Sequence, residues 1–221
     1  MFINNIKLEE ICQKGLIKDD NIEIIFENFY KELNNIMDNW CKCYEERFSE
    51  GKMRKNRGDD IEFFCKKIIT MFNELYKVNV YAVKGINDKK KLLINYKDQT
   101  IKKDHQVDLH IYKDDKFIAV IECKAYLDSC YYVRAYDDFK LFKKFGYNIK
   151  TYIFSLENSI DENTKVFTDV ITEYVCDDIF YILDGKRISN KPVYNKKYKK
   201  PINKEKLIYF IISMKKLLIN I

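Results

Sequence analysis

Three ionisable residues near the middle of the chain have the types and the spacing needed to hydrolyse a phosphodiester. Asp108 lies in a strand-like segment over 106–112, and Glu122 and Lys124 end an apolar strand-like segment over 117–124. A short charged stretch separates the two segments, which predicts a β-hairpin. Carboxylates on neighbouring strands can bind a divalent metal ion, and a nearby lysine can position water or stabilise negative charge. We therefore expect a metal-dependent hydrolytic site on this hairpin.

The alternation of apolar residues predicts the register in which the two strands pair. A three-residue turn over 114–116 pairs Leu109 with Ile121 and gathers the apolar side chains on one face. Asp108 then lies opposite Glu122 on the other face. A two-residue turn would put the two acids on opposite faces, because a slip of one residue inverts every side chain. Hydrophobic patterning thus favours the register that brings the acids together.

Other polar residues of the first strand are expected beside this site. In the same register Gln106 lies opposite Lys124, where it could hydrogen-bond the attacking water or a phosphate. His110 shares the face of Asp108, and either contact with substrate or a structural hydrogen bond suits it. His105 is expected at the edge of the strand. A Cys/His nucleophile pair and a Gly-rich phosphate loop are both missing from the sequence, which argues against a covalent mechanism or an NTPase.

With these residues the chain resembles the PD-(D/E)xK nuclease superfamily, whose largest group is the type II restriction endonucleases. Asp108 matches the first aspartate of the motif, Glu122 the second acid and Lys124 the lysine, while Val107 stands where the motif name has proline. The resemblance implies an α/β fold with an αβββαβ core, in which helices flank a mixed central sheet. It also implies hydrolysis of double-stranded DNA that depends on Mg²⁺, for which Mn²⁺ can substitute.

We expect Asp108, Glu122 and the backbone carbonyl of Cys123 to bind the metal ion. Lys124 either orients or deprotonates the attacking water, or stabilises the charged transition state, and both one-metal and two-metal mechanisms stay open. Enzymes that resemble this chain often carry a glutamate on the helix before the hairpin, which makes Glu62 a candidate outer ligand. The alternative for Glu62 is a first-turn acid favoured by the helix dipole.

Basic residues are concentrated in one stretch of the sequence. Over 186–206 there are nine lysines and arginines and one acid, whereas the net charge of the whole chain is +6. Such a strip beside a metal site suits a polyphosphate ligand, although a solvated lysine-rich loop is the alternative. The residues expected to contact DNA come from this strip, from a basic loop over 51–58 and from the segment after Lys124: Arg54, Lys55, Arg57, Tyr131, Arg134, Lys186, Arg187, Lys191, Lys196, Lys197, Lys199 and Lys200. For Arg134 a surface ion pair is the default alternative.

Length and composition suit one soluble globular domain over 1–221. The chain has 221 residues, 47% of them hydrophobic and 33% charged, with no uncharged apolar run long enough to span a membrane and no secretory signal. The seven cysteines are irregularly spaced, which favours a reducing cytoplasm over a disulfide framework. We expect a helical N-terminal region over 1–56, a catalytic core over 57–184, and a basic loop with a C-terminal helix over 185–221.

Hydrophobic periodicity predicts helices that alternate with strands around the hairpin. Helical spacing marks 22–48, a segment beginning at 59–60, a segment with Ala135, Phe139 and Phe142 inward, 161–175 and 203–220. Strand-like segments are found at 78–84, 91–96, 149–155 and 179–183, with loops at 51–58 and 125–130.

The leading functional hypothesis is a sequence-specific restriction-type endonuclease that acts as a homodimer on a symmetric DNA site. A structure-selective nuclease, such as a junction resolvase or a repair nuclease, shares the same chemistry. A nucleic-acid-binding module whose acids are merely structural is the alternative from a different class.

Overall fold

The computed structural model describes residues 19–84, 92–96, 99–103, 107–160 and 175–219, and its centre is a mixed five-stranded sheet. The strand order is β1-β4-β5-β6-β7. The first three strands pair antiparallel and β5, β6 and β7 pair parallel. Their bounds are β1 Val80–Val83, β4 Leu109–Lys113, β5 Lys116–Leu127, β6 Lys150–Asn158 and β7 Asp178–Tyr181. The expected α/β class with a mixed sheet is confirmed.

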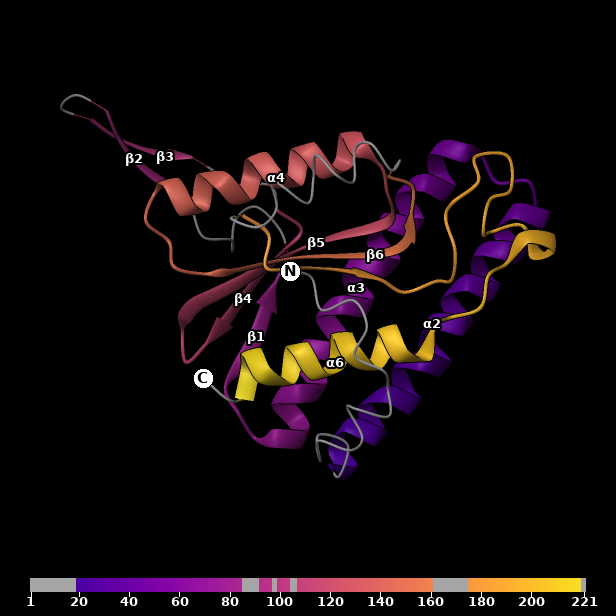
Figure 1. The fold of residues 1–221 in the computed structure, drawn as a ribbon, viewed down its shortest axis with the longest axis horizontal. Coiled ribbons are helices and arrows are strands. Elements are labelled where there is room, and N and C mark those ends of the chain that lie inside the picture. Colours follow the sequence, from indigo (N-terminus) through magenta and orange to yellow (C-terminus); the bar gives the residue numbers. More distant parts are fainter. Residues whose placement is uncertain (1–18, 85–91, 97–98, 104–106, 161–174, 220–221) are drawn as a thin grey trace.

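Helices cover both faces of this sheet (Figure 1). Helices α2 (Asp20–Glu45), α3 (Glu50–Tyr76) and α6 (Lys204–Ile219) lie on one face, and α4 (Ser129–Lys144) lies on the other. The order α3-β1-β4-β5-α4-β6 matches the expected αβββαβ core. A separate antiparallel ribbon of β2 (Leu92–Tyr96) and β3 (Gln99–Lys103) is inserted between β1 and β4.

The two-helix hairpin of α2 and α3 packs on the sheet through a continuous apolar core. Asp19 caps α2 by accepting a hydrogen bond from the Asn21 N–H at 3.0 Å. Buried side chains then recur along α2 at the i, i+3 and i+4 spacing of an amphipathic helix: Ile22, Ile25, Phe29, Leu33, Met37 and Trp40. Within α3, the ring of Phe64 contacts both Phe29 of α2 and Phe154 of β6. The helix predicted over 22–48 is therefore present, with an earlier start and end.

The loop predicted over 51–58 is wrong, because α3 begins at Glu50 and runs through it. Ser49 caps the helix, and Met53 and Arg57 are buried on the same side as the later core residues. Each glycine in a helix costs about 1 kcal/mol, and burial of this added face offsets that cost. Asp59 and Asp60 consequently lie inside α3 and not at its N-terminus. Asp60 accepts a hydrogen bond from the Trp40 indole at 2.7 Å.

The β4–β5 hairpin has the expected register at the site but a different turn. Leu109 pairs with Ile121 and Ile111 with Ala119, as the alternation of apolar residues predicts. Nearer the turn Lys113 pairs with Lys116, so Asp114 and Asp115 form a two-residue turn, with φ of 48° and 59°. A β-bulge at Ile118 absorbs the extra residue and restores the register. The predicted three-residue turn is corrected to a two-residue turn plus a bulge.

The remaining elements extend or shorten the predicted ones. β5 continues to Leu127 and Asp128 caps α4, which shortens the loop predicted over 125–130. Ala135, Phe139 and Phe142 of α4 are buried as predicted. The short 3₁₀-helix η1 (Lys196–Tyr198) interrupts the basic loop, and α6 agrees with the helix predicted over 203–220. Most of the helix predicted over 161–175 lies outside the described residues. Among the helices described, none is both long and apolar enough to cross a membrane.

Candidate active site

Asp108, which immediately precedes β4, meets Glu122 in the middle of β5. The backbone N–H of Asp108 donates to Glu122 Oε2 at 3.3 Å, and the backbone N–H of Cys123 donates to Asp108 Oδ2 at 2.8 Å. Both acids lie on the face of the sheet opposite to Leu109 and Ile121, because side chains alternate along a strand. The register of the hairpin therefore brings the two carboxylates together.

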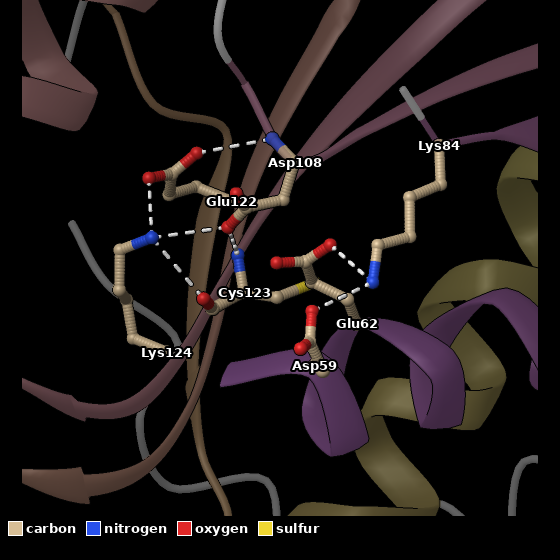
Figure 2. Close-up of polar contacts among 7 residues, drawn as sticks. All are labelled: Asp59, Glu62, Lys84, Asp108, Glu122, Cys123 and Lys124. Carbon is tan, nitrogen blue, oxygen red and sulfur yellow. Dashed lines mark hydrogen bonds and ion pairs between the residues drawn. The ribbon is translucent and has the colours of Figure 1, made fainter. Parts of the chain in front are cut away.

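Lys124 joins the two acids to the backbone of β5 (Figure 2). Its Nζ lies 2.6 Å from Glu122 Oε1, 3.0 Å from Asp108 Oδ2 and 3.2 Å from the Cys123 carbonyl oxygen. Glu122 is buried, and Asp108 and Lys124 are partly buried. One ammonium group thus stands where two carboxylates and one peptide carbonyl converge, in surroundings that water reaches only in part.

Burial and the neighbouring charges shift the pKa values of Glu122 and Lys124. Burial raises the pKa of Glu122 to about 7, and the negative charge of Asp108 adds to the effect while Lys124 opposes it. Burial lowers the pKa of Lys124, but the charges of Glu122 and Asp108 outweigh burial and the net pKa lies above its ordinary value. Two acids share a single cation here, so the site can accept further positive charge.

The donor atoms of the site fit a hard divalent cation. Among the described residues no group of three or more His, Cys, Asp or Glu side chains is arranged to hold a metal ion. The converging donors are instead two carboxylates and the carbonyl oxygen of Cys123, an all-oxygen set of the kind that Mg²⁺ prefers. Burial and the negative charge of Asp108 raise the pKa of Glu122, and a bound cation would favour its ionised form.

A second ion-pair cluster from α3 and β1 borders the site. Lys84, just after β1, places its Nζ 3.0 Å from Glu62 Oε2 and 3.1 Å from Asp59 Oδ1 (Figure 2). Burial raises the pKa of Glu62, and the charge of Asp108 raises it further while Lys84 opposes the shift. Glu62 therefore lies within electrostatic reach of Asp108. Its place inside α3 removes the alternative of a first-turn acid favoured by the helix dipole.

The other residues predicted near the chemistry have varied positions. Tyr131 is half-buried at the start of α4, with its ring against Tyr126 and 6.0 Å from Lys124 Nζ. Arg134 is exposed on α4. His110 is fully buried and stacks on Phe117, so it is a structural residue that substrate cannot reach. Gln106 and His105 lie outside the described residues.

The residues predicted to contact DNA divide into exposed and paired groups. Arg54 and Lys55 are exposed on α3, and Arg54 pairs with Glu50 at 3.3 Å. Exposed positions in the basic loop are Lys186, Lys191, Lys196 and Lys197. The half-buried lysines of that loop form ion pairs, Lys199 with Asp38 at 2.6 Å and Lys200 with Glu157 at 2.7 Å.

Arg57 requires a correction, because it is not an exposed loop residue. Only 6% of its surface is exposed, and its Nε donates to the Met53 carbonyl within α3 at 3.2 Å. No pattern in the sequence predicted the ion pairs of Lys84, because its partners Asp59 and Glu62 come from another element, α3. Tyr126 could have been found, because it follows Glu122 and Lys124 at the two-residue spacing of one strand face.

Comparison with known proteins finds similarity in sequence and in structure. No protein-family model matches the chain. Over 113 residues the chain is 29% identical to the type II restriction enzyme DdeI of Desulfomicrobium norvegicum (strain DSM 1741 / NCIMB 8310), covering 46% of this chain and 47% of that enzyme. The chain thus spans about half the length of the curated relative that it matches. The matched part of the chain is therefore distantly related in sequence to a type II restriction enzyme.

The structural likeness is to a chain from the native BbvCI A2B2 tetramer. It covers 95% of this chain and 96% of that chain, with a TM-score of 0.41 and 13% sequence identity. A TM-score of this size supports no conclusion about function.

Proposed function

We propose that this protein is a metal-dependent endonuclease of the restriction type, which hydrolyses double-stranded DNA at a specific sequence. The observation that carries the proposal is the convergence of Asp108, Glu122 and the Cys123 carbonyl on the ammonium of Lys124. The sequence similarity to a type II restriction enzyme supports the same conclusion, and favours it over a structure-selective nuclease.

Asp108, Glu122 and the Cys123 carbonyl are the residues that would hold Mg²⁺, or Mn²⁺ in its place. When bound there, the cation would supply Lewis-acid chemistry, polarising the scissile phosphate and making the attacking water more acidic. Glu122 must be deprotonated to serve as a ligand, and its pKa of about 7 makes that step depend on pH near neutrality. Glu62, which pairs with Lys84 and is within electrostatic reach of Asp108, would hydrogen-bond a water of the site.

Lys124 acts in this proposal as an electrostatic stabiliser and not as the base. In the metal-free site the charges of Glu122 and Asp108 outweigh burial and raise the pKa of Lys124, so the amine is protonated at neutral pH and has no lone pair with which to take a proton from water. A protonated amine within 3.0 Å of both carboxylates is instead suited to stabilise the negative charge that develops on the phosphate.

The exposed basic residues of α3, of the start of α4 and of the basic loop would contact the phosphate backbone. A symmetric recognition site would be cut on both strands by a homodimer, with one active site for each strand. Arg54, Lys55, Arg134, Lys186, Lys191, Lys196 and Lys197 are exposed and suited to such contacts.

Digestion of a plasmid of known sequence tests the proposal. With Mg²⁺ we expect discrete fragments whose mapped ends share one short sequence, and no cleavage in EDTA. Glu122→Ala and Lys124→Ala should each abolish cleavage, and Lys67→Gln, which removes a surface charge elsewhere on α3, should leave the pattern unchanged. A smear would indicate a non-specific nuclease, and cuts only in branched DNA would indicate a structure-selective one. Binding of DNA without any cleavage by the wild type would support a non-catalytic binding module.

A further inference from the structure

Two arginines from distant parts of the sequence, Arg57 and Arg187, lie within electrostatic reach of each other beside the candidate active site. Arg187 of the basic loop places its guanidinium carbon 3.8 Å from the ring centre of Tyr126. Tyr126 follows Lys124 by two residues on β5, so both side chains are on the same face of the sheet. Arg57 of α3 places its guanidinium carbon 4.2 Å from the ring centre of Tyr194.

The backbone holds Arg187 firmly at this position. Lys186 forms a parallel bridge with Asn158 at the end of β6, and the Arg187 N–H donates to the Asn158 carbonyl at 2.7 Å. Lys200 Nζ, which is paired with Glu157, also donates to the Lys186 carbonyl at 2.6 Å. The backbone at Arg187 is therefore attached to the same sheet that carries the acids.

Neither arginine has an acidic partner among the residues that the structure describes. Arg57 is more than nine-tenths buried, and a charged group so deeply placed is normally paired. Burial lowers the pKa of Arg57; Tyr194 and Tyr126 oppose this shift, and the positive charges of Arg187 and Arg54 add to it. By contrast, the nearby Lys199 and Lys200 each have a carboxylate partner. The arrangement concentrates positive charge at one point, where an anion would relieve the repulsion.

We propose that Arg57 and Arg187, stacked on Tyr194 and Tyr126, form a binding site for a backbone phosphate that neighbours the scissile phosphate. A guanidinium that stacks on an aromatic ring keeps the N–H groups along its edge for hydrogen bonds, in the planar fork that matches phosphate oxygens. Arg57 already donates its Nε–H to the Met53 carbonyl, so its two terminal NH2 groups would meet the phosphate. Two residues along a strand span about 6.6 Å, so Tyr126, on which Arg187 stacks, lies close to Lys124 on β5. The inference rests on the proposed function in taking DNA as the ligand.

The test measures binding of a fluorescein-labelled 20-base-pair DNA duplex by fluorescence anisotropy, in EDTA and over a range of salt concentrations. Arg187→Ala should weaken binding roughly tenfold at low salt and reduce the slope of log K against log salt by about 0.9, the value for one lost phosphate contact. Arg57→Met should have the same two effects, and Arg57→Lys a smaller loss of affinity, because the charge remains without the fork. The matched control is Lys67→Gln, which removes one charge from α3 at a lysine already paired with Glu32 at 2.6 Å.

Circular dichroism and thermal melting establish which variants are folded, and if Arg57→Met does not fold, Arg187→Ala carries the test. A folded Arg187→Ala with the affinity and salt slope of the wild type would overturn the phosphate site, as would a wild type that binds no DNA. Because the assay needs no cleavage, the two proposals can fail separately. A wild type that shows the expected slopes but never cuts DNA in Mg²⁺ would refute the endonuclease and leave the phosphate site in place.

Discussion

At the scale of single residues, the candidate site is a problem of charge balance. Asp108 and Glu122 bring two carboxylates into a partly dry environment, and Lys124 supplies one positive charge to both. Burial, and then the negative charge of Asp108, raise the pKa of Glu122 to about 7, although Lys124 opposes the shift. The backbone contributes as well, because the Cys123 peptide donates its N–H to Asp108 and offers its carbonyl to Lys124.

The proposed role of Cys123 concerns its carbonyl and not its thiol. The thiol is buried in the core on the α3 side of the sheet, away from the carboxylates. Cys123→Ala should therefore retain cleavage within a few-fold and lose about 1 kcal/mol of stability through the missing sulfur. Asp108→Asn should abolish cleavage, because it removes a ligand charge and leaves the shape unchanged. Initial rates on plasmid DNA, with urea unfolding of both variants, check this; an inactive but folded Cys123→Ala would contradict the assignment.

The raised pKa of Glu122 makes stability depend on pH in the absence of metal. The folded protein binds a proton at Glu122 with a pKa of about 7, against an ordinary value of 4.5, so between these values it holds more protons than the unfolded chain. The free energy of unfolding should consequently fall as the pH rises through this window, on the order of 2–3 kcal/mol from this group. Urea titrations at pH 5 and 8 in EDTA measure the change.

Glu122→Gln supplies the control for that measurement, since an amide does not titrate. The difference between wild type and Glu122→Gln isolates this group from Glu62 and Asp178, whose pKa values burial also raises. Mg²⁺ should restore part of the stability of the wild type at pH 8 and none of that of Glu122→Gln. Parallel pH curves for the two proteins would show that Glu122 titrates normally.

At the scale of elements, the β4–β5 hairpin decides whether the acids meet. Its turn and its bulge act together: the two-residue turn alone would set the strands one residue out of step, and the bulge at Ile118 corrects this before the site is reached. The backbone hydrogen bond from Asp114 to the Asn79 carbonyl at 2.9 Å also ties the turn to the start of β1. The geometry of the site thus depends on a bend well removed from it.

The turn requires a left-handed backbone conformation at Asp114, which only some residue types tolerate, and substitutions can test this. Asp114 has a φ of 48°, in the left-handed region where Asn and Asp are tolerated and β-branched residues are not. Asp114→Val should destabilise the protein by about 1–2 kcal/mol, and Asp114→Asn should change stability by less than about 0.5 kcal/mol. Urea midpoints measure both. Equal stability of the two variants would mean that the turn does not hold this conformation in solution.

At the scale of the whole molecule, one face of the sheet is closed by three helices that are joined at a polar contact. Asp19, the cap of α2, accepts hydrogen bonds from Tyr76 at the end of α3 and from Lys215 of α6, each at 2.5 Å. Burial alone would raise the pKa of Asp19, but the bonds from Lys215 and Tyr76 outweigh it and the pKa is lowered. This contact links segments separated by almost the whole length of the chain.

Weakening the contact at Asp19 should destabilise the whole protein. Asp19→Asn keeps the cap but removes the charge, and should destabilise the protein by about 1–3 kcal/mol, which lowers the melting temperature by several degrees. Glu27→Gln, an exposed acid on the same helix, is the control and should have little effect. Thermal melts at pH 7 compare the two. Because the lowered pKa stabilises the folded state only while Asp19 is ionised, the difference should shrink as the pH falls below the ordinary value of 3.8.

Local patterns in the sequence were enough to predict the α/β class and the meeting of Asp108 with Glu122. Strand alternation has a period of two and needs no distant information, so it placed Leu109 opposite Ile121 without coordinates. The turn could not be predicted in the same way, because a bulge leaves the alternation on both sides intact. Helical spacing likewise identified α4 and α6 and the residues that they bury.

Other features followed only from tertiary packing. The glycines at 51 and 58 indicate a loop when considered alone, and α3 forms there because burial of Met53 and Arg57 offsets their cost. Lys84 meets Glu62 across two elements, and Arg57 approaches Arg187 from a position 130 residues earlier in the chain. Periodicity reports which face of an element is apolar, whereas ion pairs and guanidinium clusters depend on which elements become neighbours. Packing of the whole core decides which elements become neighbours.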